Sequence, residues 1–231
     1  MALFEIGPVF YQATEGELPH ELSRLAIAMT GPRSLSSWDS EDSSAMDFFD
    51  LKGTLSELFR GLRIKGLQFE PGDSPIYHSG KCVLVSVNGQ ALGYMGELHP
   101  LVRERYDLPE TPVIAAELDL AKILESIPGK YEVRPVPAYP PVLEDFAIIV
   151  DENIPAERVL EVVKEAGGST LVDVRLFDVY RGEQIGEGKK SLAYSLSYQA
   201  PDRTLTDEEV AKIRKRIVKH LDSELDAKLR S

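Results

Sequence analysis

The pattern of apolar and polar residues is most regular between residues 139 and 230, where strand and helix signals alternate. Phe146–Val150 reads as a strand, and the apolar spacing that follows is that of a helix ending at Gly167–Gly168. Leu171–Tyr180 and Lys189–Gln199 read as two strands joined by a glycine-rich turn. A final helix and a short last strand over Ala227–Arg230 complete the order strand, helix, strand, strand, helix, strand.

The final helix begins with Thr206 and Glu209, which have the spacing of a capping box. Its apolar stripe consists of Val210, Ile213, Ile217, Leu221 and Leu225. The element order is that of a split βαβ, ferredoxin-like unit, in which both helices cover one face of the sheet and the other face stays open.

Alternation along the two middle strands predicts which residues occupy the open face. The large residues of Lys189–Gln199 share one side and should face the helices, together with Val172, Val174 and Leu176 of the preceding strand. The apolar phase then slips to Phe177 and Val179, which predicts a β-bulge. The open face is expected to carry Asp173, Arg175, Asp178, Tyr180, Ser191 and Ser195.

These side chains suit recognition of single-stranded RNA. The phenol of Tyr180 can stack on an unpaired base, Asp178 can accept hydrogen bonds from base amines, and the serines let a strand approach closely. From the residues alone, a structural interpretation is favoured, in which Arg175 pairs with Asp178 on a solvated strand and Tyr180 caps the core.

The first 127 residues predict a mixed antiparallel domain. An apolar stripe over Asp47–Leu62 indicates a buried helix, and Asn88–Gly89 tolerates the positive φ of a tight hairpin turn. Cys82, the single cysteine, is expected to be a strand core residue, without disulfide or metal site. Further strands are expected at Leu3–Tyr11, Leu25–Met29, Cys82–Val87, Ala91–Tyr94 and Val113–Leu118, and further helices at Pro100–Tyr106 and Leu120–Ser126.

The boundary between the two parts is rich in proline. Five prolines occur within residues 128–141, which breaks any helix there and predicts a linker over 128–138. The Ser-rich, acidic stretch Ser34–Ser44 is expected to be an exposed loop. The fold class is therefore α+β, with domains at 1–127 and 139–231.

The net charge of −12 argues against a broadly basic RNA-binding surface. Neither half of the chain is basic, but the final helix carries a local positive patch. That patch consists of Lys212, Arg214, Lys215, Arg216 and Lys219. No apolar run is long enough to span a bilayer and the N-terminus has no secretory signal pattern, so a soluble, cytoplasmic protein is expected.

Two further signals are rejected. Gly186–Ser191 partly resembles a phosphate-binding loop, but the spacing of its glycines and lysines differs from that of the motif. We therefore interpret it as a hairpin turn. Glu97 and His99 could suggest acid–base chemistry, but no nucleophile accompanies them and Pro100 follows, so helix capping or local structure is the better interpretation.

Four runs of the second part resemble the ferredoxin-fold anticodon-binding domain that ends the beta subunit of bacterial phenylalanyl-tRNA synthetase. They are Tyr139–Asp145, Arg175–Gly182, Gly188–Ala193 and Arg203–Val210. The resemblance implies that the open face receives the anticodon stem and loop of tRNA(Phe). Asp178, Tyr180 and Ser191 match the family's positions, and Arg175 and Arg181 are additional candidates. With the resemblance, RNA binding becomes the favoured interpretation.

The first part resembles the class II-like core module of the same subunit, through Leu3–Gly7 with Val9–Phe10, Asp47–Gly53, Gly93–Leu101 and Ala116–Leu120. The resemblance implies a module that has lost the ATP and amino-acid machinery and packs against the catalytic alpha subunit. We thus expect tRNA binding and alpha-subunit scaffolding, with no catalytic residue, cofactor or metal on this chain. ATP and Mg are expected on the rest of the holoenzyme, which attaches Phe to tRNA.

The family's beta subunit is longer, and Met1–Ala2 directly before a matching strand suggests an expressed fragment that does not aminoacylate alone and whose self-association stays open. Two alternatives remain: a stand-alone RNA-binding module with the same fold, and a structural module whose acidic first domain docks a partner.

Overall fold

The computed structural model describes residues 1–14, 16, 18–34, 37–38, 44–130 and 136–230. The chain divides into two compact units, Met1–Glu132 and Val133–Ser231, and each is treated by itself. Parts of two predicted segments fall outside the described residues: 131–135 of the linker, and 35–36 and 39–43 of the Ser-rich loop. In the described part of the chain, no helix combines the length and the hydropathy that crossing a membrane requires.

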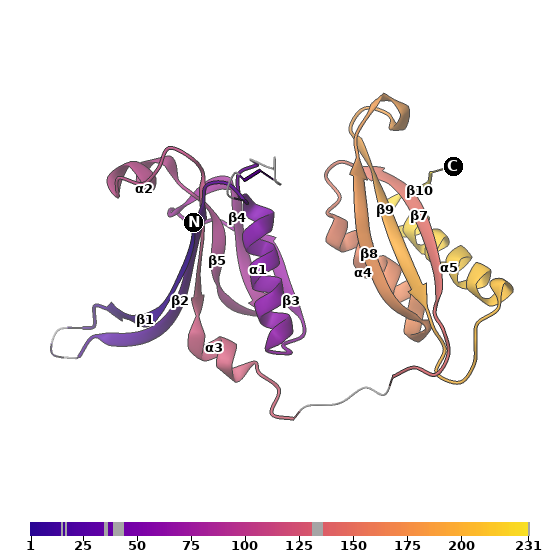
Figure 1. Cartoon of the computed structure of the whole chain (residues 1–231), viewed down its shortest axis with the longest axis horizontal. Coiled ribbons are helices and arrows are strands. Elements are labelled where there is room, and N and C mark those ends of the chain that lie inside the picture. Colours follow the sequence, from indigo (N-terminus) through magenta and orange to yellow (C-terminus); the bar gives the residue numbers. More distant parts are fainter. Residues whose placement is uncertain (15, 17, 35–36, 39–43, 131–135, 231) are drawn as a thin grey trace. The chain divides into compact units, whose positions relative to one another are not determined.

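The first unit is built on a six-stranded antiparallel sheet with the order β1-β2-β6-β5-β4-β3 (Figure 1). Its strands are β1 (Ala2–Tyr11), β2 (His20–Thr30), β3 (Leu67–Pro71), β4 (Tyr77–Val87), β5 (Gln90–Leu98) and β6 (Val113–Asp119). Its helices are α1 (Phe48–Gly61), α2 (Pro100–Arg105) and α3 (Leu120–Glu125). The mixed antiparallel prediction is confirmed, and β3 is an addition that the sequence analysis did not foresee.

The core of the first unit lies between α1 and the sheet. Leu51, Leu55 and Phe59 of α1 are almost fully buried against residues of the central strands, as the stripe of the predicted helix requires. Cys82 is buried on β4, which confirms its expected place in the core.

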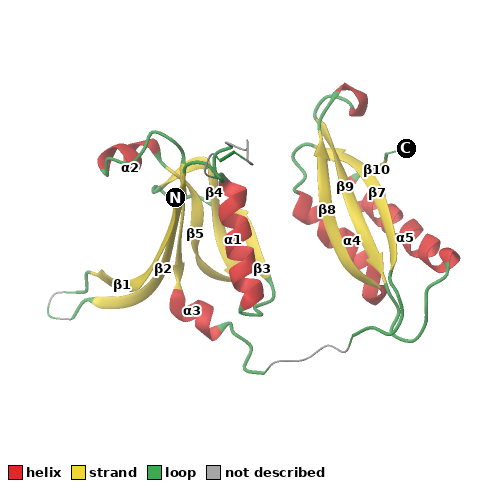
Figure 2. Cartoon of the chain, in the orientation of Figure 1, coloured by secondary structure: helices red, strands yellow, loops and turns green. Residues whose placement is uncertain are grey.

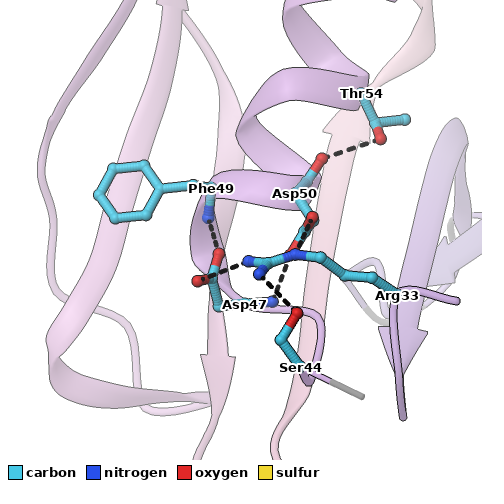
Figure 3. Close-up of polar contacts among 6 residues, drawn as sticks. All are labelled: Arg33, Ser44, Asp47, Phe49, Asp50 and Thr54. Atoms are coloured by element: carbon cyan, nitrogen blue, oxygen red, sulfur yellow. Dashed lines mark hydrogen bonds and ion pairs between the residues drawn. The ribbon is translucent and has the colours of Figure 1, made fainter. Parts of the chain in front are cut away.

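The start of α1 is fixed by a network of acidic side chains around Arg33 (Figure 3). Asp47 caps the helix by accepting the backbone N–H of Phe49 at 2.8 Å, and Asp50 accepts the backbone N–H of Asp47 at 2.6 Å. The guanidinium of Arg33 donates to both carboxylates and to the hydroxyl of Ser44. Free N–H groups and positive partial charge at a helix start explain why two acids are stable there.

Two local predictions in the first unit are confirmed. Asn88 and Gly89 have φ values of 49° and 80°, as a tight hairpin turn between β4 and β5 requires. His99 caps α2, because its Nδ1 accepts the backbone N–H of Leu101 at 3.2 Å. Glu97 forms an ion pair with Lys81 at 2.5 Å, so both residues have structural partners.

The second unit has the predicted ferredoxin-like arrangement. Its sheet has the order β10-β7-β9-β8, and all neighbours are antiparallel. The elements are β7 (Val142–Asp151), α4 (Ala156–Gly167), β8 (Leu171–Tyr180), β9 (Lys189–Tyr198), α5 (Asp207–Leu225) and β10 (Lys228–Leu229). Figure 2 shows α4 and α5 side by side on one face of the sheet, which leaves the other face open.

The predicted direction of β9 is confirmed. Leu192, Tyr194, Leu196 and Tyr198 are at most 1% exposed and belong to the core shared with α4 and α5. The capping box of α5 is also present, since Thr206 and Glu209 exchange hydrogen bonds between side chain and backbone.

Strand β8 contains two irregularities instead of the single predicted bulge. Its register with β9 shifts between Leu176 and Asp178, as predicted, and also between Leu171 and Asp173. Val172 and Phe177 are the extra residues at the two shifts, and they are 52% and 53% exposed. Their predicted inward direction is therefore wrong: an extra residue in a bulge has no partner across the ladder and does not follow the alternation.

Candidate nucleic-acid interface

The open face of the second sheet can be assigned from the strand register, because directly opposed residues share a face. Asp173, Arg175, Asp178 and Tyr180 of β8 oppose Ser197, Ser195, Ala193 and Ser191 of β9. On β7, Leu143, Asp145, Ala147 and Ile149 oppose the same four residues of β9. The face that the sequence predicted therefore exists with all six of its predicted members.

Tyr180, at the end of β8, is held between a glycine and a cation. A Cβ on Gly182 would lie 2.3 Å from the Tyr180 hydroxyl oxygen, so only glycine lets the ring settle there. The guanidinium carbon of Arg230 lies 4.8 Å from the centre of the same ring, within the range of a cation–π contact. The aromatic platform is thus present but partly covered.

Asp178 and Arg175 are exposed and lie on the same face of β8 as Tyr180. Within the described residues neither side chain has a hydrogen-bond or ion-pair partner, so the alternative in which they pair with each other does not form. A carboxylate acceptor and a guanidinium donor are therefore available to a ligand on this face.

Ser191 lies on the open face but is only 2% exposed. The Arg230 side chain covers it, with Nη1 at 3.5 Å from the Ser191 hydroxyl oxygen. A ligand reaches this hydroxyl only when the guanidinium moves.

The cations next to the hairpin between β8 and β9 are already paired. Arg181 donates to the Glu152 carboxylate at 2.8 and 3.1 Å, and Lys189 forms an ion pair with Asp151 at 2.7 Å. The hydrogen bonds from Arg181 lower the pKa of Glu152, and the same bonds raise the pKa of Arg181. Arg181 can bind an anion only by exchanging Glu152 for it.

A hollow of about 450 Å³ extends the interface along β8 and β9. Phe177, which was predicted to point inward, lines this hollow beside Arg175. The bulge therefore places an aromatic ring on the open side of the sheet. The remaining walls are Leu143, Asp145, Asp173, Ser195, Leu196 and Ser197.

The basic run on α5 does not contribute to the open face, because α5 packs on the opposite face of the sheet. Arg214 is paired with Glu144 at 2.7 Å, and Arg216 donates to the carbonyl oxygens of Ala166 and Gly167 at the end of α4. Part of this patch is therefore structural.

Arg230 is the residue of the interface that the sequence analysis missed. The backbone N–H of Arg230 donates to the carbonyl oxygen of Ala147 at 2.8 Å, next to the pairing of Lys228 with Ile149. Extending the alternation through the expected last strand, Ala227–Arg230, would have placed Lys228 and Arg230 together on the open face. In the described part of the chain, no group of three His, Cys, Asp or Glu side chains could hold a metal ion.

The first unit presents a different kind of surface. Strand β1 is at the edge of its sheet, and with part of β2 it projects beyond the rest of the unit (Figure 1). Its exposed apolar side chains include Leu3, Phe4, Ile6 and Phe10, of which Phe4 is 75% exposed. An edge strand with so many exposed apolar residues is typical of a protein-docking surface.

Comparison with known proteins gives a consistent result for both units. Residues 1–120 match the family model described as the phenylalanyl tRNA synthetase beta chain CLM domain. Residues 137–230 match the ferredoxin-fold anticodon binding domain.

Similar curated proteins are phenylalanine–tRNA ligase beta subunits from several bacteria. Those of Symbiobacterium thermophilum, Geobacillus kaustophilus and Listeria monocytogenes are 44%, 39% and 40% identical, each over the whole of this chain. The chain covers 26% of the first relative and 28% of the other two, so it spans little more than a quarter of their length.

Proposed function

The chain belongs to the phenylalanine–tRNA ligase beta-subunit family, and we propose that its second unit binds the anticodon region of tRNA(Phe) while its first unit docks the catalytic alpha subunit. A cytoplasmic location is part of the same proposal. The chain contributes binding, and the chemistry of aminoacylation, with ATP and Mg, belongs to the rest of the holoenzyme.

The observation that carries the RNA proposal is the open face of the β10-β7-β9-β8 sheet. It combines an aromatic ring, an unpaired carboxylate and an unpaired guanidinium, from Tyr180, Asp178 and Arg175, within the described residues. Single-stranded RNA is recognised by stacking of unpaired bases and by hydrogen bonds to their edges, and these three groups supply both kinds of contact.

Each candidate residue then has a distinct role. Tyr180 stacks on a base, Asp178 accepts from the base amines, and Arg175 contacts a phosphate or a base edge. Ser191 offers its hydroxyl once the side chain above it moves, and Arg181 takes part after exchange with Glu152. The acidity of the whole chain is compatible with this site because recognition relies on stacking and directed hydrogen bonds.

The decisive experiment is a titration of a tRNA(Phe) transcript with the whole chain at several salt concentrations. We expect salt-dependent binding that Tyr180→Ala weakens by about tenfold, since one base–aromatic stack is worth about 1–3 kcal/mol. Tyr106→Ala is the matched control, because Tyr106 is exposed but lies in the first unit. Absence of salt-dependent binding, or equal binding by the two variants, would reject the RNA proposal.

The docking proposal rests on the exposed apolar residues of β1. We infer that β1 and the adjoining part of β2 pack against the alpha subunit, which buries side chains that the first unit leaves in water. Co-expression with the alpha subunit of a related bacterium, followed by a pull-down on either partner, tests this. A chain that binds tRNA(Phe) but never captures the alpha subunit would instead favour a stand-alone RNA-binding module.

A further inference from the structure

Arg230 and Tyr180 approach each other from opposite edges of the second sheet. Arg230 follows β10 and Tyr180 ends β8, and two strands, β7 and β9, lie between them. Strands spaced by 4.7–4.9 Å place these backbones about 14 Å apart, so the two side chains meet only by lying flat across the sheet. The 4.8 Å between the guanidinium carbon and the ring centre shows that they do.

The residues of the sheet beneath the contact between Arg230 and Tyr180 have small side chains. Ala147 of β7 and Ala193 and Ser191 of β9 are small residues on the open face, so the diagonal from Arg230 to Tyr180 crosses small side chains, with Ile149 at its flank. The backbone hydrogen bond from Arg230 to Ala147 fixes where the side chain starts. The long side chain then fills the space above Ser191 and buries it.

The charge of Arg230 is not used by any carboxylate in the described part of the chain. Arg181 and Lys189, by contrast, have acidic partners at 2.8 and 2.7 Å. The contacts of Arg230 are an aromatic ring and, at 3.5 Å, a weak hydrogen bond to a hydroxyl. Neither neutralises a cation, so the guanidinium keeps its capacity to bind an anion.

We propose that Arg230 is an RNA-contacting residue, which binds the phosphate of the nucleotide whose base stacks on Tyr180. The inference rests on the function proposed for this face. In the free protein the guanidinium covers the ring and the Ser191 hydroxyl together. When a base takes its place on Tyr180, the guanidinium swings aside, uncovers Ser191 and becomes a cation beside the same nucleotide.

The test is a salt titration of an RNA hairpin carrying the anticodon stem and loop of tRNA(Phe) with the whole chain and its variants. Each protein–phosphate contact contributes about 0.7–0.9 to the slope of log affinity against log salt concentration. We expect Arg230→Ala to bind about tenfold more weakly, as loss of a charged hydrogen bond predicts, and to lose one such increment of slope. Arg230→Lys should keep the slope, because it keeps the charge.

Two further variants make the result specific. Arg230→Met keeps most of the side-chain length without the charge, so it should lose the same increment of slope even if Arg230→Ala disturbs the end of the sheet. Lys215→Ala removes an exposed cation from α5, on the opposite face, and should change neither affinity nor slope.

If Arg230→Ala and Arg230→Met bind the hairpin with an affinity equal to or higher than that of the wild type, the proposal is overturned. Arg230 would then only shield Tyr180 and Ser191 from solvent. Weaker binding with an unchanged slope would also overturn the proposal, because the residue would then only position Tyr180. Either result, together with loss of binding in Tyr180→Ala, leaves the proposed function intact. A wild-type chain that does not bind the hairpin contradicts both proposals.

Discussion

The Nε–H of Arg33 donates to both carboxylate oxygens of Asp50, at 2.9 and 3.1 Å, and so ties the chain before α1 to the first turn of that helix. The hydrogen bond from Arg33 is the largest cause of a lowered pKa for Asp50. Figure 3 shows the same guanidinium reaching Asp47 and Ser44. One arginine therefore organises the whole start of the helix.

This ion pair predicts a pH dependence of stability. Because the pKa of Asp50 is lower in the folded state, the stabilisation is complete above the unfolded value of about 3.9 and is lost as the pH falls through the folded value. Wild-type stability, measured by denaturant unfolding, should therefore fall more steeply below about pH 5 than that of Asp50→Asn. Glu110 is an exposed acid with no ion pair in the described part of the chain, so Glu110→Gln should follow the wild type. Parallel curves for wild type and Asp50→Asn would contradict the prediction.

Two buried tyrosines on β9 predict opposite responses to the loss of a hydroxyl. The Tyr194 hydroxyl donates to the Ala156 carbonyl at 3.1 Å, whereas the Tyr198 hydroxyl is buried with no hydrogen-bond partner among the described residues. Tyr194→Phe should lower the free energy of unfolding by about 1 kcal/mol, and Tyr198→Phe should leave it unchanged or raise it. Denaturant unfolding of the two variants is a matched comparison. An equal loss in both would show that the Tyr198 hydroxyl has a partner in solution.

The elements that the sequence predicted well are those whose signal is local. Such signals involve residues that are close together in the sequence, as in the apolar stripe of α1, the capping box at Thr206 and the turn at Asn88. The ferredoxin-like fold could be predicted from the order of these strands and helices along the chain, because few topologies are compatible with that order. Family resemblance then supplied the function, which no composition or charge argument reached.

The errors concern contacts between distant segments. Phe177 looked like a core residue because it is apolar, but its direction is set by the register of β8 on β9, where it is the extra residue of a bulge. The covering of Ser191 depends on Arg230, 39 residues further along the chain. Alternation within one strand contains no information about a side chain that arrives from another.

Gly182 predicts a change of function without loss of fold. A Cβ at this position would stand 2.7 Å from Cζ of Tyr180, so the ring must move from its place on the open face. Gly182 has extended backbone, with φ near 180°, so alanine itself is not strained there. Gly182→Ala should keep its stability within about 0.5 kcal/mol but bind tRNA(Phe) more weakly, by less than Tyr180→Ala does.

Gly129→Ala is a suitable control for that experiment, because its Cβ would meet nothing within 4 Å and it lies outside the second unit. The tRNA(Phe) titration proposed above compares wild type, Gly182→Ala, Tyr180→Ala and Gly129→Ala. Wild-type affinity in Gly182→Ala would mean that the ring position seen here is not the one that RNA uses.

The exposed apolar residues of β1 predict a variant that separates docking from RNA binding. Phe4 and Ile6 are 75% and 56% exposed, so replacing both with aspartate costs the isolated chain little, within about 1 kcal/mol. At a docked interface the same carboxylates would be buried without partners, which is strongly unfavourable. Phe4→Asp/Ile6→Asp should therefore abolish capture of the alpha subunit in a pull-down while tRNA(Phe) affinity stays unchanged. Leu124→Asp, at an exposed position of α3, is the control for added charge. Undiminished capture by the β1 variant would exclude β1 as the docking surface, because no interface tolerates two unpaired charges at its centre without a large loss of affinity.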